Sequence, residues 1–230
     1  MIAVFKFLNL LFPQVCLNCN ERLQSAGIIC SSCEQKFSEL EHICEVCGSP
    51  NQNYKCKVCG KIEFYFDKAR SVFKLNNLLR NLIHNFKYEE FTKIGRYLGC
   101  KAVSYLQQEK PFAKIDYIIP VPLHKVKKRK RGFNQAKIIS DVIAKNLKLQ
   151  YKQDILQRQK FTKTQTKLSR QERKQNVRKA FSVKYPELIR NKNILVVDDV
   201  FTTGSTVNSI AETLKKCNVN RVFVLTIARA

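Results

Sequence analysis

Residues 194–206 have the sequence ILVVDDVFTTGST, and this stretch decides the class of fold. The run 194–197 is apolar throughout, which is typical of a parallel strand covered on both faces. It leads directly into two adjacent aspartates, Asp198 and Asp199, then into a hydroxyl-rich turn with one glycine, and then into a helical pattern. Strand, acidic pair, glycine turn and helix follow one another in the order that a phosphate site at the edge of a sheet requires.

The turn after the aspartates has the residue types that bind phosphate. It consists of Thr202, Thr203, Gly204, Ser205 and Thr206. Its backbone N–H groups and the positive end of the next helix attract an anion. The two carboxylates upstream can accept hydrogen bonds from vicinal ribose hydroxyls, directly or through Mg²⁺, which prefers oxygen ligands. The segment therefore predicts a site for a ribose 5-phosphate, and the simpler alternative is a helix-capping turn.

The rest of the carboxyl-terminal part alternates between strand and helix patterns. Strands are predicted over 116–123, 194–197 and 221–228, and helices over 75–86, 91–106, 133–147 and 205–217. This alternation is typical of an α/β domain with an open, doubly wound, mostly parallel sheet. Cys100 and Cys217 fall inside helical patterns and are predicted to be buried.

Eight of the ten cysteines form CxxC pairs. The pairs are Cys16 with Cys19, Cys30 with Cys33, Cys44 with Cys47, and Cys56 with Cys59. Two such pairs supply the four thiolates that tetrahedral zinc requires, so four pairs predict two closed, structural zinc sites. Redox pairs and disulfides are the alternatives. Short gaps favour sites built from consecutive pairs, and alternating pairing remains open. The predicted division is a zinc-binding module with a preceding helix in 1–62 and the α/β domain in 63–230.

The amino-terminal stretch, residues 1–13, indicates in which cellular compartment the protein is found. Only 12 residues, with Lys6 among them, precede Pro13, and a segment of this length is too short to cross a bilayer. No secretory signal pattern is present. The helical spacing of its apolar residues predicts packing on the protein's own core, and contact with a membrane surface is the alternative. We therefore expect no transmembrane segment and a cytoplasmic protein, with a peripheral place at the inner membrane face as the alternative. Cytoplasmic thiols stay reduced, which favours zinc over disulfides.

The chain is strongly basic. Its 230 residues include 42 Lys and Arg against 18 Asp and Glu, which gives a formal net charge of +24, while 44% hydrophobic residues exclude wholesale disorder. The densest basic run consists of Lys125, Lys127, Lys128, Arg129, Lys130 and Arg131. This run exceeds what a diphosphate needs and predicts a polyanion, with single-stranded nucleic acid as the partner and Phe133 and Phe161 as stacking candidates. The alternative is a solvated, lysine-rich face.

Three segments carry a resemblance to known families. VVDDVFTTGST at 196–206 resembles the phosphoribosyl diphosphate (PRPP) motif of type I phosphoribosyltransferases. IIPVPLHKVKKRKRGFNQA at 118–136 and LQRQKFTKTQTKLSRQERKQNVRKAF at 156–181 resemble the ComF family of competence proteins. With the cysteine pairs, the resemblance covers nearly the whole chain. It implies a small double zinc ribbon followed by a type I phosphoribosyltransferase-like domain. It also implies a part in DNA uptake and natural transformation, with imported single-stranded DNA and the uptake machinery as partners.

The resemblance also implies roles for individual residues. Asp198 and Asp199 would hold the ribose hydroxyls, the turn 202–206 would bind the 5-phosphate, and Mg²⁺ would accompany PRPP. Val121 and Pro122 would open the diphosphate loop, with Arg131 near the leaving group. The segment 158–178 resembles the loop that closes over active transferases. The alternative function is transfer of the ribosyl 5-phosphate of PRPP to an unidentified nucleobase or other nucleophile. The chain stops directly after the last predicted strand, where active transferases often supply part of a base-binding hood, and this favours the competence role.

Overall fold

The computed structural model describes residues 14–24, 27–52, 55–88, 91–159 and 180–230. The expected amino-terminal helix, Phe161 and nearly all of the loop expected over 158–178 lie outside these residues. Among the helices of the described part, none has the length and apolar character that a bilayer span requires.

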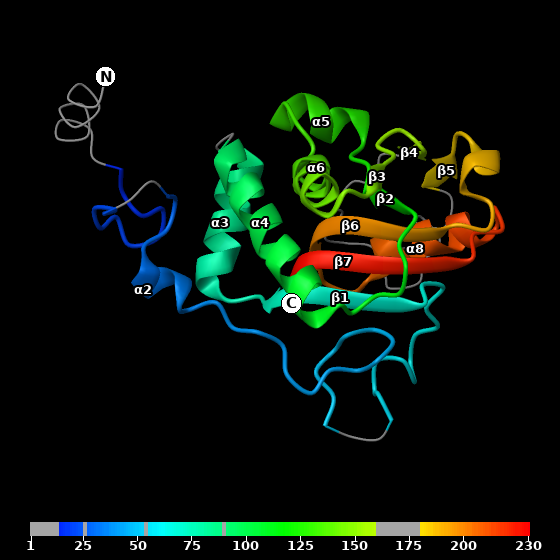
Figure 1. The fold of residues 1–230 in the computed structure, drawn as a ribbon, viewed down its shortest axis with the longest axis horizontal. Coiled ribbons are helices and arrows are strands. Elements are labelled where there is room, and N and C mark those ends of the chain that lie inside the picture. Colours follow the sequence, from blue (N-terminus) through cyan, green and yellow to red (C-terminus); the bar gives the residue numbers. More distant parts are fainter. Residues whose placement is uncertain (1–13, 25–26, 53–54, 89–90, 160–179) are drawn as a thin grey trace, which may run out of the picture.

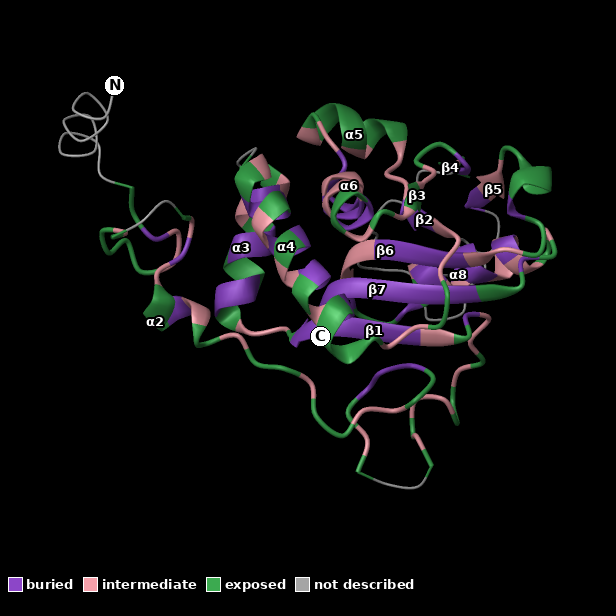
Figure 2. Ribbon diagram, viewed as in Figure 1, coloured by how far each residue is buried: buried purple, intermediate pink, exposed green. Residues whose placement is uncertain are grey.

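The centre of the molecule is a five-stranded parallel sheet (Figure 1). Its order is β1 (Lys68–Lys74), β7 (Arg221–Arg229), β6 (Asn193–Phe201), β2 (Tyr117–Pro120) and β3 (Gln150–Tyr151). The two long central strands are buried along most of their length, which is why their sequences are nearly continuous apolar runs (Figure 2). The predicted open parallel sheet is thereby confirmed.

Helices cover both faces of this sheet. On one face lie α3 (Asn77–Tyr88), α4 (Thr92–Glu109) and α6 (Gln135–Leu147), whose apolar residues share one core cluster with the strands. On the other lie α8 (Ser205–Lys215), the 3₁₀ turn η1 (Pro186–Ile189) and the hairpin of β4 (Leu156–Arg158) and β5 (Phe181–Val183). The sheet is therefore doubly wound, as the alternating pattern predicts.

Some elements differ from the sequence-based expectation. The sequence predicts a loop after Pro122, but this stretch contains the short helix α5 (Lys125–Arg131). The His124 side chain caps this helix by accepting a hydrogen bond from the Val126 N–H at 3.2 Å. Strand β1 was not predicted. Cys100 is exposed rather than buried, because it lies on the opposite side of α4 from the buried Leu98 and Ala102, and Cys217 is only half-buried.

Two glycines allow α4 to pack closely against its neighbours. A Cβ built on Gly99 would lie 2.8 Å from the Cβ of Val142 on α6. A Cβ on Gly95 would collide with the ring of Phe86, which is fully buried, and would lie 2.9 Å from Ile138. The close approach of α3, α4 and α6 therefore depends on these two positions.

Gly95→Ala is expected to lower the free energy of unfolding by about 1–3 kcal/mol, because the buried ring of Phe86 has no room for the added methyl group. This net loss is expected although alanine is the better helix former by about 1 kcal/mol. Denaturant unfolding followed by circular dichroism measures it. Ser104→Ala, on the exposed side of the same helix, is the control and should change stability by less than about 0.5 kcal/mol. An equally stable Gly95→Ala variant would show that the packing is looser than described.

Candidate functional site

The two aspartates lie at the carboxyl end of β6, in the middle of the sheet. The strand continues through them to Phe201, with Asp198 opposite Thr226 and Val200 opposite Ala228 on β7, so the sheet holds the backbone that carries both carboxylates. The Asp199 N–H donates to Asp198 Oδ1 at 2.9 Å. Lys87, in the last turn of α3, places its Nζ 2.5 Å from Asp199 Oδ2, and the two side chains are 21% and 13% exposed. One acid is thus paired with a cation from another element before any ligand arrives.

The other acid is held near its neutral form. Burial, reinforced by the negative charge of Asp199, raises the pKa of Asp198 to about 7. The Asp199 N–H and the positive charges of Lys87 and Arg158 oppose this rise. Two neighbouring carboxylates in a half-buried place cannot both ionise at low cost. The pair is therefore suited to hydroxyl groups or cations that relieve the repulsion.

The turn after the strand forms a small hollow. Its lining consists of Asp198 and the residues from Val200 to Val207. Gly204 has a φ of 73° and is the N-cap residue of α8. It has no side chain with which to satisfy the first N–H groups of that helix. The hydroxyl groups of Thr203 and Ser205 lie 2.8 Å apart at the same turn. The hollow thus combines a helix N-terminus, hydroxyl groups and a nearby acid, which is the chemistry expected of a phosphate ester site.

Four cations lie near one another at this end of the sheet, and two of them, Lys87 and Arg158, interact with the acids. Lys127 and Arg131 lie four residues apart on one side of α5, and both are half-buried. The Arg131 guanidinium lies 5.2 Å from the ring centroid of Tyr88, next to Lys87 in the chain. Burial, together with the positive charges of Arg158, Arg131 and Lys87, lowers the pKa of Lys127. This mutual influence shows that cations from α3, α5 and β4 crowd into one place.

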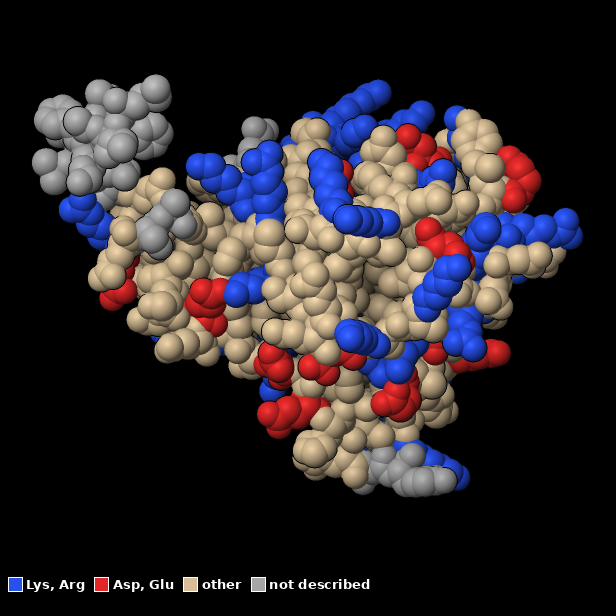
Figure 3. Space-filling view, in the orientation of Figure 1, with Lys and Arg blue, Asp and Glu red and all other residues tan. Residues whose placement is uncertain are grey.

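The structure divides the basic run that sequence reasoning treated as one. Lys127 and Arg131 are half-buried and lie near Lys87 and Arg158, the two cations that interact with the acid pair. The other four, Lys125, Lys128, Arg129 and Lys130, are exposed. Figure 3 shows Lys and Arg side chains projecting from the edge of the molecule where α5 lies. We refer to these four residues as the outer basic face.

Val121 and Pro122 connect this helix to the sheet. The Val121 N–H donates to the Val197 carbonyl at 2.9 Å, and the Val121 carbonyl accepts from Asn134 Nδ2 at 2.9 Å. These bonds place the start of α5 beside the end of β6. The acid pair, the phosphate turn and the start of the basic helix therefore lie together at the carboxyl ends of the central strands.

Sequence reasoning missed Lys87, and it named Arg158 only as the start of a loop. Lys87 is an ordinary lysine in the last turn of an amphipathic helix, and a single sequence holds no signal that separates it from the other lysines. Arg158 lies on β4 with its guanidinium 5.3 Å from the ring centroid of Phe181. Phe133, a predicted stacking residue, packs in the core against Phe86 with ring centroids 5.5 Å apart.

The eight paired cysteines form two clusters, each with four sulfur atoms within 4.8 Å of one another. The first ribbon consists of Cys16, Cys19, Cys30 and Cys33, and the second ribbon of Cys44, Cys47, Cys56 and Cys59. Sulfur atoms from different pairs lie 3.5 Å apart in the first ribbon and 3.7 Å apart in the second. Tetrahedral zinc with Zn–S bonds of about 2.3 Å needs sulfurs about 3.8 Å apart. Both clusters fit structural zinc, and the consecutive pairing favoured by the short gaps is confirmed.

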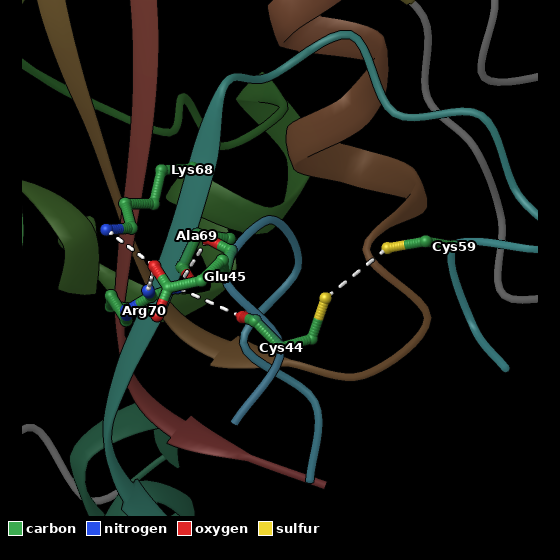
Figure 4. A network of polar contacts seen from close by, with 6 residues as sticks. All are labelled: Cys44, Glu45, Cys59, Lys68, Ala69 and Arg70. Atoms are coloured by element: carbon green, nitrogen blue, oxygen red, sulfur yellow. Dashed lines mark hydrogen bonds and ion pairs between the residues drawn. The ribbon is translucent and has the colours of Figure 1, made fainter. Parts of the chain in front are cut away.

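The two ribbons dock on different parts of the α/β core. In the first, Glu34 at the end of α2 (Ser31–Glu34) accepts a hydrogen bond from the Tyr97 hydroxyl of α4 at 2.9 Å. The second lies against edge strand β1, where the Ala69 N–H donates to the Val46 carbonyl at 2.8 Å. Arg70 on the same strand donates to the carbonyls of Cys44 and Glu45 (Figure 4). The second ribbon thus covers a sheet edge that would otherwise be open.

Comparison with known proteins covers both parts of the chain. Residues 7–63 match the model of the double zinc ribbon domain, and residues 129–230 match that of the phosphoribosyl transferase domain. The chain is 33% identical to Competence protein F of Haemophilus influenzae, over 94% of this chain and 96% of that protein. It is 29% identical to DNA utilization protein YhgH of Escherichia coli (strain K12), over 87% and 90%. It is 26% identical to Competence protein ComFC of Bacillus subtilis (strain 168), over 81% and 77%.

Asp198→Asn is expected to stabilise the protein at pH 7, by up to about 4 kcal/mol at about 1.4 kcal/mol per pKa unit. The folded protein binds the Asp198 proton more tightly than the unfolded chain, since the pKa rises from 3.8 to about 7. The contribution of this group to stability is therefore present at low pH and is lost as the pH rises from about 4 to about 7. Denaturant titrations across this range, with zinc present, measure the difference between wild type and variant.

The control for this measurement is Asp154→Asn, at a carboxylate that is 71% exposed. The difference in free energy of unfolding between this variant and wild type should not vary over the same pH range. A wild type and an Asp198→Asn variant with the same pH dependence would contradict the raised pKa.

Proposed function

Because this chain belongs to the ComF family of competence proteins, we propose that it handles imported single-stranded DNA during DNA uptake, with its acid pair and glycine turn as a site for PRPP or a related sugar phosphate. The observation that carries the proposal is the meeting, at one edge of the sheet, of Asp198, Asp199, the turn 202–206 and four cations. We place this activity in the cytoplasm, in contact with the DNA-uptake machinery.

The sugar-phosphate site has three parts in this proposal. The turn 202–206 receives the 5-phosphate at the N-terminus of α8. Asp198 and Asp199 accept hydrogen bonds from the ribose hydroxyls. Lys127, Arg131 and Arg158 face the diphosphate, whose high negative charge matches their mutual repulsion in the free protein. Mg²⁺ bound with PRPP would be held by the two aspartates and would neutralise part of the diphosphate charge.

The outer basic face is the proposed contact for the DNA backbone. Its four exposed cations lie on the same short helix as Lys127 and Arg131, so one helix serves both the pocket and the surface. Tyr88 is 59% exposed and contacts Arg131, which gives the surface an aromatic group for base stacking. This arrangement would bring a single strand to the rim of the sugar-phosphate site.

The second candidate is a phosphoribosyltransferase, and the cations around the acid pair favour it. In that reaction the bond from C1 to the diphosphate oxygen breaks and its electron pair leaves with the diphosphate. The lone pair of the incoming nucleophile forms the new bond at C1, and the nucleophile's proton passes to solvent. Lys127, Arg131 and Arg158 would stabilise the charge on the leaving group. Release of diphosphate from PRPP in the presence of a nucleophile would distinguish this candidate from binding alone.

Isothermal titration with PRPP and Mg²⁺ tests the sugar-phosphate site. The double variant Asp198→Asn/Asp199→Asn is expected to bind at least about 30-fold more weakly, since hydrogen bonds to charged groups contribute about 1.5–3 kcal/mol each. Asp154→Asn is the control and should bind as wild type does. An unchanged affinity in the double variant would remove the site. In a transformable host, the same variant should lower the yield of transformants.

Fluorescence anisotropy of a labelled single strand over a salt series tests the outer basic face. Replacing Lys125, Lys128, Arg129 and Lys130 by Gln should weaken binding and flatten the slope of log K against log salt by about 0.7 for each phosphate that the variant no longer neutralises. The matched control removes four exposed charges at the opposite, amino-terminal edge of the sheet: Lys110, Lys114, Arg190 and Arg221. An equal decrease in affinity in both variants would show that binding depends on the net charge of the protein and not on the outer basic face.

A further inference from the structure

Arg229 is a buried cation that the sugar-phosphate site does not use directly. It is the last residue of β7, and it is only 6% exposed. A buried guanidinium is costly unless hydrogen bonds and opposite charge compensate it. Both compensations come from the second ribbon. Arg229 Nη1 donates to the Cys47 carbonyl at 2.7 Å, and four thiolates around one Zn²⁺ would supply the opposite charge.

The other side of Arg229 contacts the base of the phosphate turn. Its guanidinium carbon lies 4.2 Å from the ring centroid of Phe201, the residue opposite it in the pairing of β6 with β7. The Phe201 ring is 2% exposed and lies directly beneath Gly204, where an added Cβ would come within 2.5 Å of it. The position of this ring therefore limits how the backbone of the turn can lie.

A second connection joins the same two regions. The chain that leaves the second ribbon passes beside the first turn of α8, where Asn208 holds it. The Asn208 side chain accepts from the Tyr65 N–H at 2.7 Å and donates to the Glu63 carbonyl at 3.0 Å. The Asn208 N–H in turn donates to the Gly204 carbonyl at 2.8 Å. Phe64, in this same segment, also contacts the position that a Cβ on Gly204 would take.

We propose that Arg229 is a positioning residue that joins the second zinc ribbon to the phosphate turn, so that zinc binding and sugar-phosphate binding strengthen each other. A loaded ribbon of four thiolates and one Zn²⁺ carries a charge of about −2 and fixes the Cys47 carbonyl, which together hold Arg229 against Phe201. Without zinc, the Arg229 guanidinium loses the negative charge of the ribbon and the fixed Cys47 carbonyl. The Phe201 ring then loses the guanidinium that packs against it. The phosphate part of this inference rests on the proposed function of the turn.

Coupling between two sites is reciprocal, and this gives a test on the wild-type protein. Ribose 5-phosphate should protect the thiols of the second ribbon from alkylation during exposure to a chelator by at least about fivefold. Mass spectrometry resolves each cysteine pair, so the first ribbon, which docks on α4, is an internal control and should not respond. If ribose 5-phosphate binds but protects neither ribbon, or both equally, the inference is wrong.

Hydrogen exchange at the Asn208 amide, which donates to the Gly204 carbonyl of the turn at 2.8 Å, tests the connection without any sugar phosphate, and so separates it from the proposed function. Removing zinc from the wild type should speed this exchange at least about fivefold. In Arg229→Met the exchange should already be fast with zinc bound. Arg229→Lys, which keeps the charge without the planar group, should lie between the two. Slow exchange in both zinc-loaded variants would overturn the proposal. An exchange rate in the wild type that is the same with and without zinc would also overturn it. Should the Met variant fail to fold, the Lys variant and the wild type still decide.

Arg70 provides the matched control variant. It is 4% exposed and also donates to backbone carbonyls of the second ribbon, but its hydrogen bonds go to Cys44, Glu45 and Ala69 (Figure 4). Arg70→Met should therefore weaken zinc retention in the second ribbon and leave the zinc-loaded exchange of the Asn208 amide as in wild type. If Arg70→Met and Arg229→Met speed this exchange equally, general loosening of the ribbon explains the effect and the role given to Arg229 is wrong.

Discussion

Two adjacent carboxylates at the end of a buried central strand set the main constraint on this structure. The sheet holds the backbone on both sides of the pair, which keeps the carboxylates of Asp198 and Asp199 near each other. The protein answers with a cation paired to Asp199 and a raised pKa at Asp198. The cations that act on the acids, Lys87 and Arg158, come from α3 and β4, so both elements approach this end of the sheet. The arrangement keeps one charged and one partly protonated carboxyl group available for hydroxyl groups, at a cost in stability that rises with pH.

The two zinc ribbons stand in different relations to that edge. The first packs on the helical face through Glu34 and α4, far in the fold from the turn. The second lies on β1 and reaches through Arg229 to the ring beneath the turn. Metal sites of the same composition can thus have different consequences, because what matters is which core residues their knuckles touch. A closed zinc site needs no chemistry of its own to affect a binding site elsewhere.

Features that depend on local spacing could be predicted from the sequence. The central strands, the main helices and the consecutive pairing of the cysteines follow from apolar periodicity and short gaps. Strand β1 escaped notice because Lys68, Arg70 and Ser71 interrupt its apolar pattern, and their partners lie in the second ribbon and on β7. Helix α5 was missed because it buries none of its residues and so carries no apolar stripe.

In the candidate site, too, the parts that are contiguous in sequence could be predicted and the parts that the fold brings together could not. Its acids and turn are contiguous in sequence, whereas Lys87 and Arg229 reach it only through the fold. Lys127 is half-buried, unlike its exposed neighbours, because it lies on the inner side of α5, a helix that the sequence analysis did not predict.

The most direct measurement is a crystal structure of the full chain with PRPP and Mg²⁺. We expect the 5-phosphate against the amides of 203–206, the ribose hydroxyls at Asp198 and Asp199, and the diphosphate facing Lys127 and Arg131. A ligand bound at the outer basic face alone, or no ligand at the acid pair and the turn at saturating PRPP, would contradict this expectation.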